Sequence, residues 1–281
     1  MKQTILIPID GTESSSETLL YIRSIAPQSE SQIVLVHVTP NIDSANASIE
    51  IHPNVNEIHN ELKQDGWNVE RETRIGDPVH EIIKMAILLP ATLILMSTHG
   101  RSGIERIRQG SVTEQVLKQS PCPVFILHSS LPEPADQRTE HLFNRILVPL
   151  DGTDASSPIL SCVERFALMH DSEIIMFHDE IEKAESEEEK AAIRAKLQDQ
   201  SVTLANKGLK VSLDMTTYKR PIREILDRID EMGIDLVSMA THGDGGKQRA
   251  MNESVTAEVI RHSNCPLLVW SAEPQCPPVK A

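Results

Sequence analysis

The sequence predicts an α/β protein made of two copies of one doubly wound domain, each built on a parallel sheet. The first observation is an internal repeat: TILIPIDGTESSS begins at Thr4, and the similar NRILVPLDGTDASS begins at Asn144. The second observation is that short apolar runs alternate with helical patterns within each copy. Because strands and helices that alternate in this way connect through right-handed crossovers, helices are expected on both faces of each sheet.

The repeat sets the expected domain boundaries. Asp10 and Asp151 are equivalent and lie 141 residues apart, whereas Gly100 and Gly243 are equivalent and lie 143 residues apart. One change of two residues in length explains the difference. We expect a first domain over residues 1–129 and a second over residues 143–272. Between them, residues 130–142 are polar and contain prolines, which favours a linker, and residues 273–281 favour an irregular tail.

The apolar runs of the first copy predict five strands. They are rich in Ile, Val and Leu and show little polar alternation, which is typical of strands covered on both faces. They lie at residues 4–9, 32–38, 68–73, 92–97 and 124–127. Helical patterns separate them, and Pro78 and its equivalent Pro221 suit the first turn of a helix. Residues 180–206 of the second copy predict a long, solvated helix. Each copy is therefore expected to be a Rossmann-like domain with a five-stranded parallel sheet.

Composition excludes several functions. The net charge of -14 argues against a nucleic-acid partner, because phosphate neutralisation needs a basic face. The apolar runs are far shorter than the ~20 residues of a membrane span, and the N-terminal run is too short for a signal peptide. We therefore expect a cytoplasmic protein without a membrane partner. The equivalent Cys122 and Cys265 are expected to be small buried thiols, since the cysteines show no metal-ligand spacing.

Candidate ligand-binding residues follow the predicted strands. Ligands of open parallel sheets bind beyond the carboxyl ends of the strands. Asp10 follows the first strand, Val38 closes the second, and Ser97 ends the fourth. The carboxylate of Asp10 is a hydrogen-bond acceptor, so it suits a ribose or the edge of a base better than a phosphate.

The loop after the fourth strand has the features of a phosphate site. It leads to Gly110 and Ser111, which open a helix. A helix N-terminus offers free N–H groups and a partial positive charge, and a glycine allows close approach of the backbone. Arg101, Arg106 and Arg108 add positive charge to this loop. The alternative interpretation is an ordinary turn followed by a capped helix.

Together these motifs resemble the universal stress protein family. The family pattern Gly-x2-Gly-x9-Gly-Ser is matched from Ser97 to Ser111, except that Ser97 replaces the first glycine. An aspartate after the first strand and Cys-Pro-Val before the last strand also match, and the resemblance covers nearly the whole chain as two tandem copies. It implies an adenine-nucleotide-binding fold with strand order 3-2-1-4-5. It also implies that domains pair through their last strands, here within one chain or in a homodimer.

The resemblance implies a set of binding residues in the first copy. Those expected to contact the adenosine part are Pro8, Ile9, Asp10 and Val38. Those expected to hold the ribose and phosphates are Gly100, Gly110, Ser111, Val112 and Thr113, and Ser97, His99, Arg101 and Gly103 complete the predicted site. A structural alternative for His99 is a hydrogen bond within its turn. The expected ligand is ATP, with or without Mg²⁺, while AMP or another adenine nucleotide stays open.

The second copy departs from this pattern. Glu253 stands where the first copy has Gly110, and Asp179 replaces Val38. A carboxylate beside a phosphate repels it. We therefore expect the nucleotide mainly in the first copy and a weaker second site, formed by Asp151, Gly243, Ser254 and Val255. The alternative is that Glu253 points to solvent.

The motifs that would indicate an enzyme are missing from the sequence. It contains neither the GxSxG of a nucleophile elbow nor the GxxxxGK[ST] of a P-loop. We predict no catalytic and no metal-ligating residue, and at most slow ATP hydrolysis. The leading hypothesis is a stress-response sensor or binding module for ATP that acts on an unidentified protein partner. Two alternatives stay open: a scaffold with vestigial pockets and an adenylyl-transferring enzyme.

Overall fold

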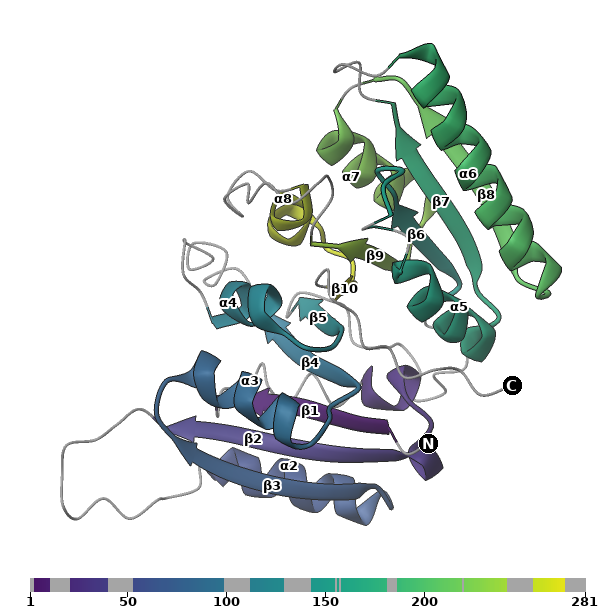
Figure 1. The fold of residues 1–281 in the computed structure, drawn as a ribbon. Helices are drawn as coiled ribbons and strands as arrows, with labels where there is room; N and C mark the ends of the chain where they lie inside the picture. The colour runs from purple at the N-terminus through teal and green to yellow at the C-terminus, as the bar shows by residue number, and fades with distance from the viewer. Residues whose placement is uncertain are drawn as a thin grey trace. The chain divides into compact units, whose positions relative to one another are not determined.

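The computed structural model describes ten parts of the chain. These are residues 3–10, 21–39, 53–98, 112–128, 143–154, 156, 158–180, 186–218, 220–241 and 255–270. The chain divides into two compact units, Met1–Thr139 (unit 1) and Glu140–Ala281 (unit 2). Each unit is a sheet flanked by helices (Figure 1).

The sheet of unit 1 is parallel throughout. Its strands are β1 (Gln3–Ile9), β2 (Ser31–Thr39), β3 (Asn68–Ile75), β4 (Leu93–Thr98) and β5 (Val124–His128). The pairings give the spatial order β3-β2-β1-β4-β5. The side chains of Ile5, Leu6 and Leu35 have no exposed surface, as expected for strands covered on both faces. The same expectation was wrong for β3, in which only Val69 is buried, because among the strands described in unit 1 this strand pairs with β2 alone. The predicted α/β class is confirmed.

Helices cover both faces of this sheet. Residues 21–25 are helical and are followed by η1 (Gln28–Glu30), α2 (Pro53–Gln64), α3 (Pro78–Leu88) and α4 (Val112–Gln119). In Figure 1, α3 and α4 lie on one face and α2 on the other. α3 begins as the sequence predicts, with Pro78 in its first turn, and the carboxylate of Asp77 accepts a hydrogen bond from the His80 amide at 2.9 Å.

Unit 2 repeats the architecture. Its strands are β6 (Arg145–Pro149), β7 (Glu173–Asp179), β8 (Lys210–Thr216), β9 (Leu236–Ala240) and β10 (Leu267–Trp270), in the order β8-β7-β6-β9-β10. Its helices are α5 (Ile159–His170), α6 (Glu187–Asn206), α7 (Pro221–Met232) and α8 (Val255–His262). α5 and α6 cover one face and α7 and α8 the other (Figure 1).

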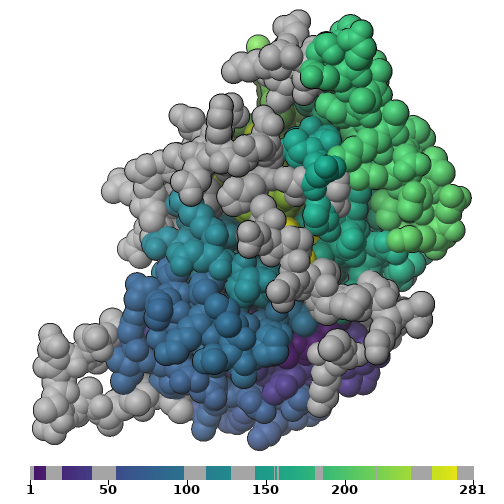
Figure 2. All heavy atoms as spheres, in the orientation of Figure 1, coloured from purple at the N-terminus to yellow at the C-terminus, as the bar shows by residue number. Residues whose placement is uncertain are grey.

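The long helix α6 forms at the position predicted for it. It begins with a capping box in which the Ser186 hydroxyl accepts from the Glu189 amide at 3.2 Å, and the Glu189 carboxylate accepts from the Ser186 amide at 2.9 Å. Its buried residues are Leu197, Ser201 and Leu204, all in its second half. The atoms of α6 and β8, green in Figure 2, form much of one side of unit 2, so the helix is solvated along most of its length.

The repeated cysteines are buried, as predicted. Cys122 and Cys265 are 5% and 4% exposed. Burial raises the pKa of the Cys122 thiol to about 12 and also raises that of Cys265, so both thiols stay protonated and unreactive at neutral pH. None of the helices described has the length and apolar character needed to cross a membrane.

Candidate functional site

The candidate site lies at the carboxyl ends of the strands, which we call the ligand edge of a unit. In unit 1, β1 lies between β2 and β4. The chain runs from β1 to β2 and β3 on one side, and returns through α3 to β4 on the other side. The strand order therefore reverses between β1 and β4, and such a switch point is where open α/β sheets bind their ligands.

Several of the predicted residues come together at this edge. Ile9 ends β1 and is buried, Pro8 is partly exposed, and Asp10 is exposed just beyond the strand. On the neighbouring strands, Val38 and Ser97 are partly exposed near the ends of β2 and β4. Because these strands are parallel, their carboxyl ends share one edge of the sheet.

The predicted phosphate-binding residues are only partly described. Val112 and Thr113 form the first turn of α4, with Val112 38% exposed and Thr113 partly exposed. The other predicted residues of the loop lie outside the described residues: His99, Gly100, Arg101, Gly103, Gly110 and Ser111. The same holds for Gly243 and Ser254 of the second site, whereas Asp151 and Val255 are described.

A buried histidine supports the ligand edge in both units. Nδ1 of His37 lies 2.9 Å from the carbonyl oxygen of Ile9, and Nδ1 of His178 lies 2.8 Å from that of Leu150. A carbonyl only accepts hydrogen bonds, so the ring nitrogen must be the donor and carries the proton. His37 therefore holds the residue that directly precedes Asp10. His37 and His178 lie 141 residues apart, the same offset as Asp10 and Asp151, so the sequence repeats the histidine but does not show its partner.

In unit 2 the aspartate after the first strand has local partners. Oδ1 of Asp151 accepts hydrogen bonds from the Thr153 amide at 2.9 Å and from the Thr153 hydroxyl at 2.7 Å. This is an Asx turn, which fixes the loop after β6 (residues 150–154). A ligand that used this carboxylate would compete with the turn.

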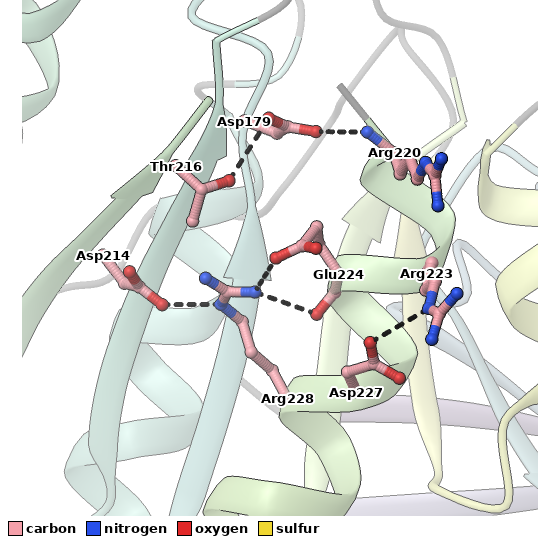
Figure 3. A network of polar contacts seen from close by, with 8 residues as sticks. All are labelled: Asp179, Asp214, Thr216, Arg220, Arg223, Glu224, Asp227 and Arg228. Carbon is pink, nitrogen blue, oxygen red and sulfur yellow. Dashed lines mark hydrogen bonds and ion pairs between the residues drawn. The ribbon is translucent and has the colours of Figure 1, made fainter. Parts of the chain in front are cut away.

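The carboxylate that replaces Val38 is anchored in unit 2. Asp179 accepts from the Arg220 amide at 3.0 Å and from the Thr216 hydroxyl at 3.2 Å (Figure 3). Arg220 is the N-cap residue of α7 and offers no side-chain cap of its own. Asp179 thus stabilises the N-terminus of α7, a task that Asp77 performs for α3 in unit 1. The sequence showed the substitution but not this partner.

The first half of α6 contacts the ligand edge of unit 2. The guanidinium of Arg194 donates two hydrogen bonds to Glu180, the residue after β7, one of them at 2.7 Å. This hydrogen bonding lowers the pKa of Glu180. Nζ of Lys196 donates to the Gly152 carbonyl at 2.9 Å and to Asp154 at 2.7 Å. The sequence predicted the helix without showing which loops it contacts.

A second polar network lies between β8 and α7. Arg228 donates to Asp214 at 2.6 Å and to the Glu224 carboxylate at 2.8 Å (Figure 3), and its guanidinium lies 4.2 Å from the ring centre of Phe177. The Arg228 side chain is only 12% exposed. Its equivalent in unit 1 is Met85, which is 2% exposed. The change from methionine to arginine at a repeated position was the available signal, and sequence reasoning missed it.

The described part of the ligand edge of unit 1 combines polar and apolar groups. Within the described ranges, His, Cys, Asp and Glu side chains form no group of three that could hold a metal ion. The ligand edge of unit 1 instead offers an exposed carboxylate at Asp10, a partly exposed apolar side chain at Val38 and the first turn of a helix. These features can recognise a base and a sugar.

The fold is shared with solved structures of similar length. A universal stress protein from Archaeoglobus fulgidus DSM 4304 superposes with a TM-score of 0.70 at 23% identity, covering 96% of this chain and 98% of that one. The functionally unknown protein PA1789 from Pseudomonas aeruginosa PAO1 gives a TM-score of 0.70 at 16% identity, covering 96% of this chain and 93% of its own. At these identities the likeness shows the fold alone.

Sequence comparison identifies the family. Universal stress protein MJ0531 of Methanocaldococcus jannaschii is 33% identical over 138 residues, which are 44% of this chain and 80% of that protein. Universal stress protein YxiE of Bacillus subtilis is 29% identical over 147 residues, 45% of this chain and 99% of that protein. The sequence model of the Universal stress protein family matches twice, at residues 1–128 and 142–270. The chain therefore belongs to the universal stress protein family and carries two of its domains in tandem.

Proposed function

We propose that unit 1 binds one adenine nucleotide, with ATP as the first candidate, and that the chain is a stress-response binding module whose nucleotide state is read by a protein partner. One observation carries the proposal. Asp10, Val38 and the first turn of α4 belong to the same ligand edge, at the point where the strand order reverses. The rest of unit 1 serves to hold this edge in place.

The chemistry of this edge fits an adenosine. An adenine ring needs an apolar contact, which Val38 and Ile9 supply, and a ribose needs hydrogen-bond acceptors, which Asp10 supplies. His37 holds the backbone beside Asp10 through its 2.9 Å hydrogen bond to the Ile9 carbonyl, which limits the backbone ordering needed when the ligand binds.

The phosphates are assigned to the segment that precedes α4. Free amides at a helix N-terminus attract anions, and Gly110 and Ser111 directly precede the first residue of α4. Together with Gly100, Arg101 and Gly103 they form the proposed phosphate seat. If Mg²⁺ accompanies ATP, it would be bound chiefly by the phosphate oxygens, as is usual for this ion. Slow hydrolysis of the bound nucleotide is the most that we expect.

Unit 2 is proposed to bind a nucleotide weakly or not at all. Asp179 and Glu180 bring two carboxylates to the ligand edge, where unit 1 has Val38 and Thr39. Glu253 adds a third carboxylate beside the proposed seat at Gly243, Ser254 and Val255. An anionic ligand is therefore disfavoured there, although the two units share a fold.

Mass spectrometry of the purified chain under non-denaturing conditions tests the proposal. We expect one ATP per chain after incubation with Mg²⁺-ATP, and loss of it in Val38→Asp, which copies the residue of unit 2. Val202→Asp is the matched control, because Val202 is 46% exposed on α6, so it should bind like the wild type. A bare chain mass together with an unchanged melting temperature in ATP would overturn the proposal and favour the ligand-free scaffold.

A further inference from the structure

Helix α6 is longer than its sheet requires. Its 20 residues span about 30 Å, whereas the seven residues of β7 span about 23 Å. α6 ends at Asn206 and β8 begins at Lys210, so the C-terminus of the helix lies level with the amino ends of the strands. The extra length therefore projects at the ligand edge. The corresponding helix of unit 1, α2, has 12 residues.

The two halves of α6 are held in different ways. The second half packs on the sheet through Leu197, Ser201 and Leu204, which are buried. In the first half, residues 187–196, all of which the structure describes, none of the side chains is buried. The first half is therefore held mainly by polar contacts, and it can detach without exposing the core of unit 2.

Those polar contacts reach both loops that form the ligand edge. Arg194 pairs with Glu180 after β7, and Lys196 binds the Gly152 carbonyl and Asp154 after β6. Between them, Ile193 packs directly on Gly152: a Cβ added there would lie 2.5 Å from Ile193 Cγ2. Gly152 and Glu180 directly follow Asp151 and Asp179, the residues equivalent to Asp10 and Val38, so the helix lies beside the positions that form the proposed site of unit 1.

The acceptor of the Arg194 ion pair is specific to unit 2. The residue equivalent to Glu180 in unit 1 is Thr39, whose hydroxyl donates to the Arg74 carbonyl at 3.2 Å. A threonine paired with the backbone cannot hold an arginine as Glu180 does. The carboxylate and the longer helix occur together in one unit, which indicates that they act together.

We propose that residues 187–196 form a resident cap on the ligand edge of unit 2, closed by Arg194, Lys196 and Ile193. The cap makes unit 2 a self-occupied site, in which the chain's own helix takes the place of a ligand. It limits the tandem protein to one nucleotide per chain independently of the repulsion from Glu253. The effect of the cap on nucleotide binding rests on the proposed function of unit 1. The contacts of the cap do not depend on that function.

Hydrogen exchange measured by mass spectrometry on the full chain tests whether the cap is closed. We expect the amides of residues 187–196 to be protected in the wild type. In the double variant Arg194→Ala/Lys196→Ala, exchange at residues 187–196 and 150–154 should become about three- to tenfold faster, with residues 197–206 unchanged. Lys207→Ala is the matched control, because Lys207 pairs with Glu164 at the other end of α6. Equal exchange in wild type and double variant would overturn the proposal.

Counting bound ATP tests whether the cap excludes a ligand. The variant Asp179→Val/Glu253→Gly gives unit 2 the residues of unit 1, and with the cap closed it should still bind one ATP per chain. Adding Arg194→Ala/Lys196→Ala should raise the count to two.

Two results would overturn exclusion by the cap. One is a second ATP in the restored variant with the cap still protected from exchange. The other is no second ATP when exchange shows the cap open. If the wild-type chain binds no ATP at all, the proposed function fails, while the exchange measurement still decides whether the cap exists.

Discussion

The contact between α6 and the loop after β6 predicts an unequal response of two glycines to alanine. Gly152 and Gly208 both have positive φ angles, 82° and 87°. An L side chain is strained in this region whatever surrounds it. The two positions differ in the room available for a side chain. A Cβ atom at Gly152 would lie 2.5 Å from Ile193, whereas nothing lies within 4 Å of a Cβ atom at Gly208.

The magnitudes follow from this difference. Gly208→Ala measures backbone strain alone, about 1–2 kcal/mol of unfolding free energy. Gly152→Ala adds overpacking against Ile193, which costs about 1–3 kcal/mol in a well-packed site. We therefore expect Gly152→Ala to destabilise unit 2 by roughly 2–5 kcal/mol in total. In an Ile193→Ala background most of the excess over Gly208→Ala should disappear.

Urea unfolding followed by tryptophan fluorescence measures these changes. The chain has two tryptophans, Trp67 in unit 1 and Trp270 in unit 2, which are 4% and 2% exposed. With Trp67→Phe as the background, Trp270 reports on unit 2. Equal losses for Gly152→Ala and Gly208→Ala, or an excess that persists in Ile193→Ala, would refute the packing of α6 on this loop and with it the closed cap.

Three further outcomes are expected. Arg228→Ala should lower the unfolding free energy of unit 2 by about 2–4 kcal/mol in the same urea assay, because the partly buried carboxylates of Asp214 and Glu224 lose their partner. Arg228→Met refills the apolar volume, as Met85 does in unit 1, but leaves the same carboxylates unpaired, so it should recover only part of this loss. Hydrogen bonds from the cap lower the pKa of Glu180 and Asp154 below their ordinary values of 4.5 and 3.8. The closed cap therefore favours the ionised carboxylates, so its stability is complete above the ordinary pKa values and is lost as the pH falls through the lowered pKa values. Hydrogen exchange at residues 187–196, corrected for intrinsic rates, should accelerate over that pH range. The acceleration should be smaller in Glu180→Gln. His37→Phe should weaken ATP binding by up to about fivefold in calorimetry, since one hydrogen bond of roughly 1 kcal/mol holds the backbone beside Asp10, and His178→Phe should leave it unchanged.

The fold was predictable because it depends on local patterns. Runs such as residues 4–9 and 32–38 contain too little polar alternation for a half-exposed sheet, and they became β1 and β2. The N-terminus of α3 was predictable for the same reason, since Pro78 acts within its own turn. These features need no knowledge of distant residues.

The contacts at the ligand edge depend on how distant segments meet. The bond between His37 and Ile9 exists because the parallel register of β1 and β2 places these residues side by side. The pairing of Asp179 with the Arg220 amide likewise requires β7 to end at the N-terminus of α7. Helix propensity predicted α6 but carries no information on which loop its first half touches. The phosphate seat around Gly110 is still a prediction from the sequence.

The central claim, one nucleotide held by unit 1, is tested most directly by calorimetric titration of the full chain with Mg²⁺-ATP. The account predicts one site per chain in the wild type and none in Gly110→Glu, which places in unit 1 the residue that unit 2 carries at position 253. Two equal sites per chain that Gly110→Glu leaves intact would contradict it.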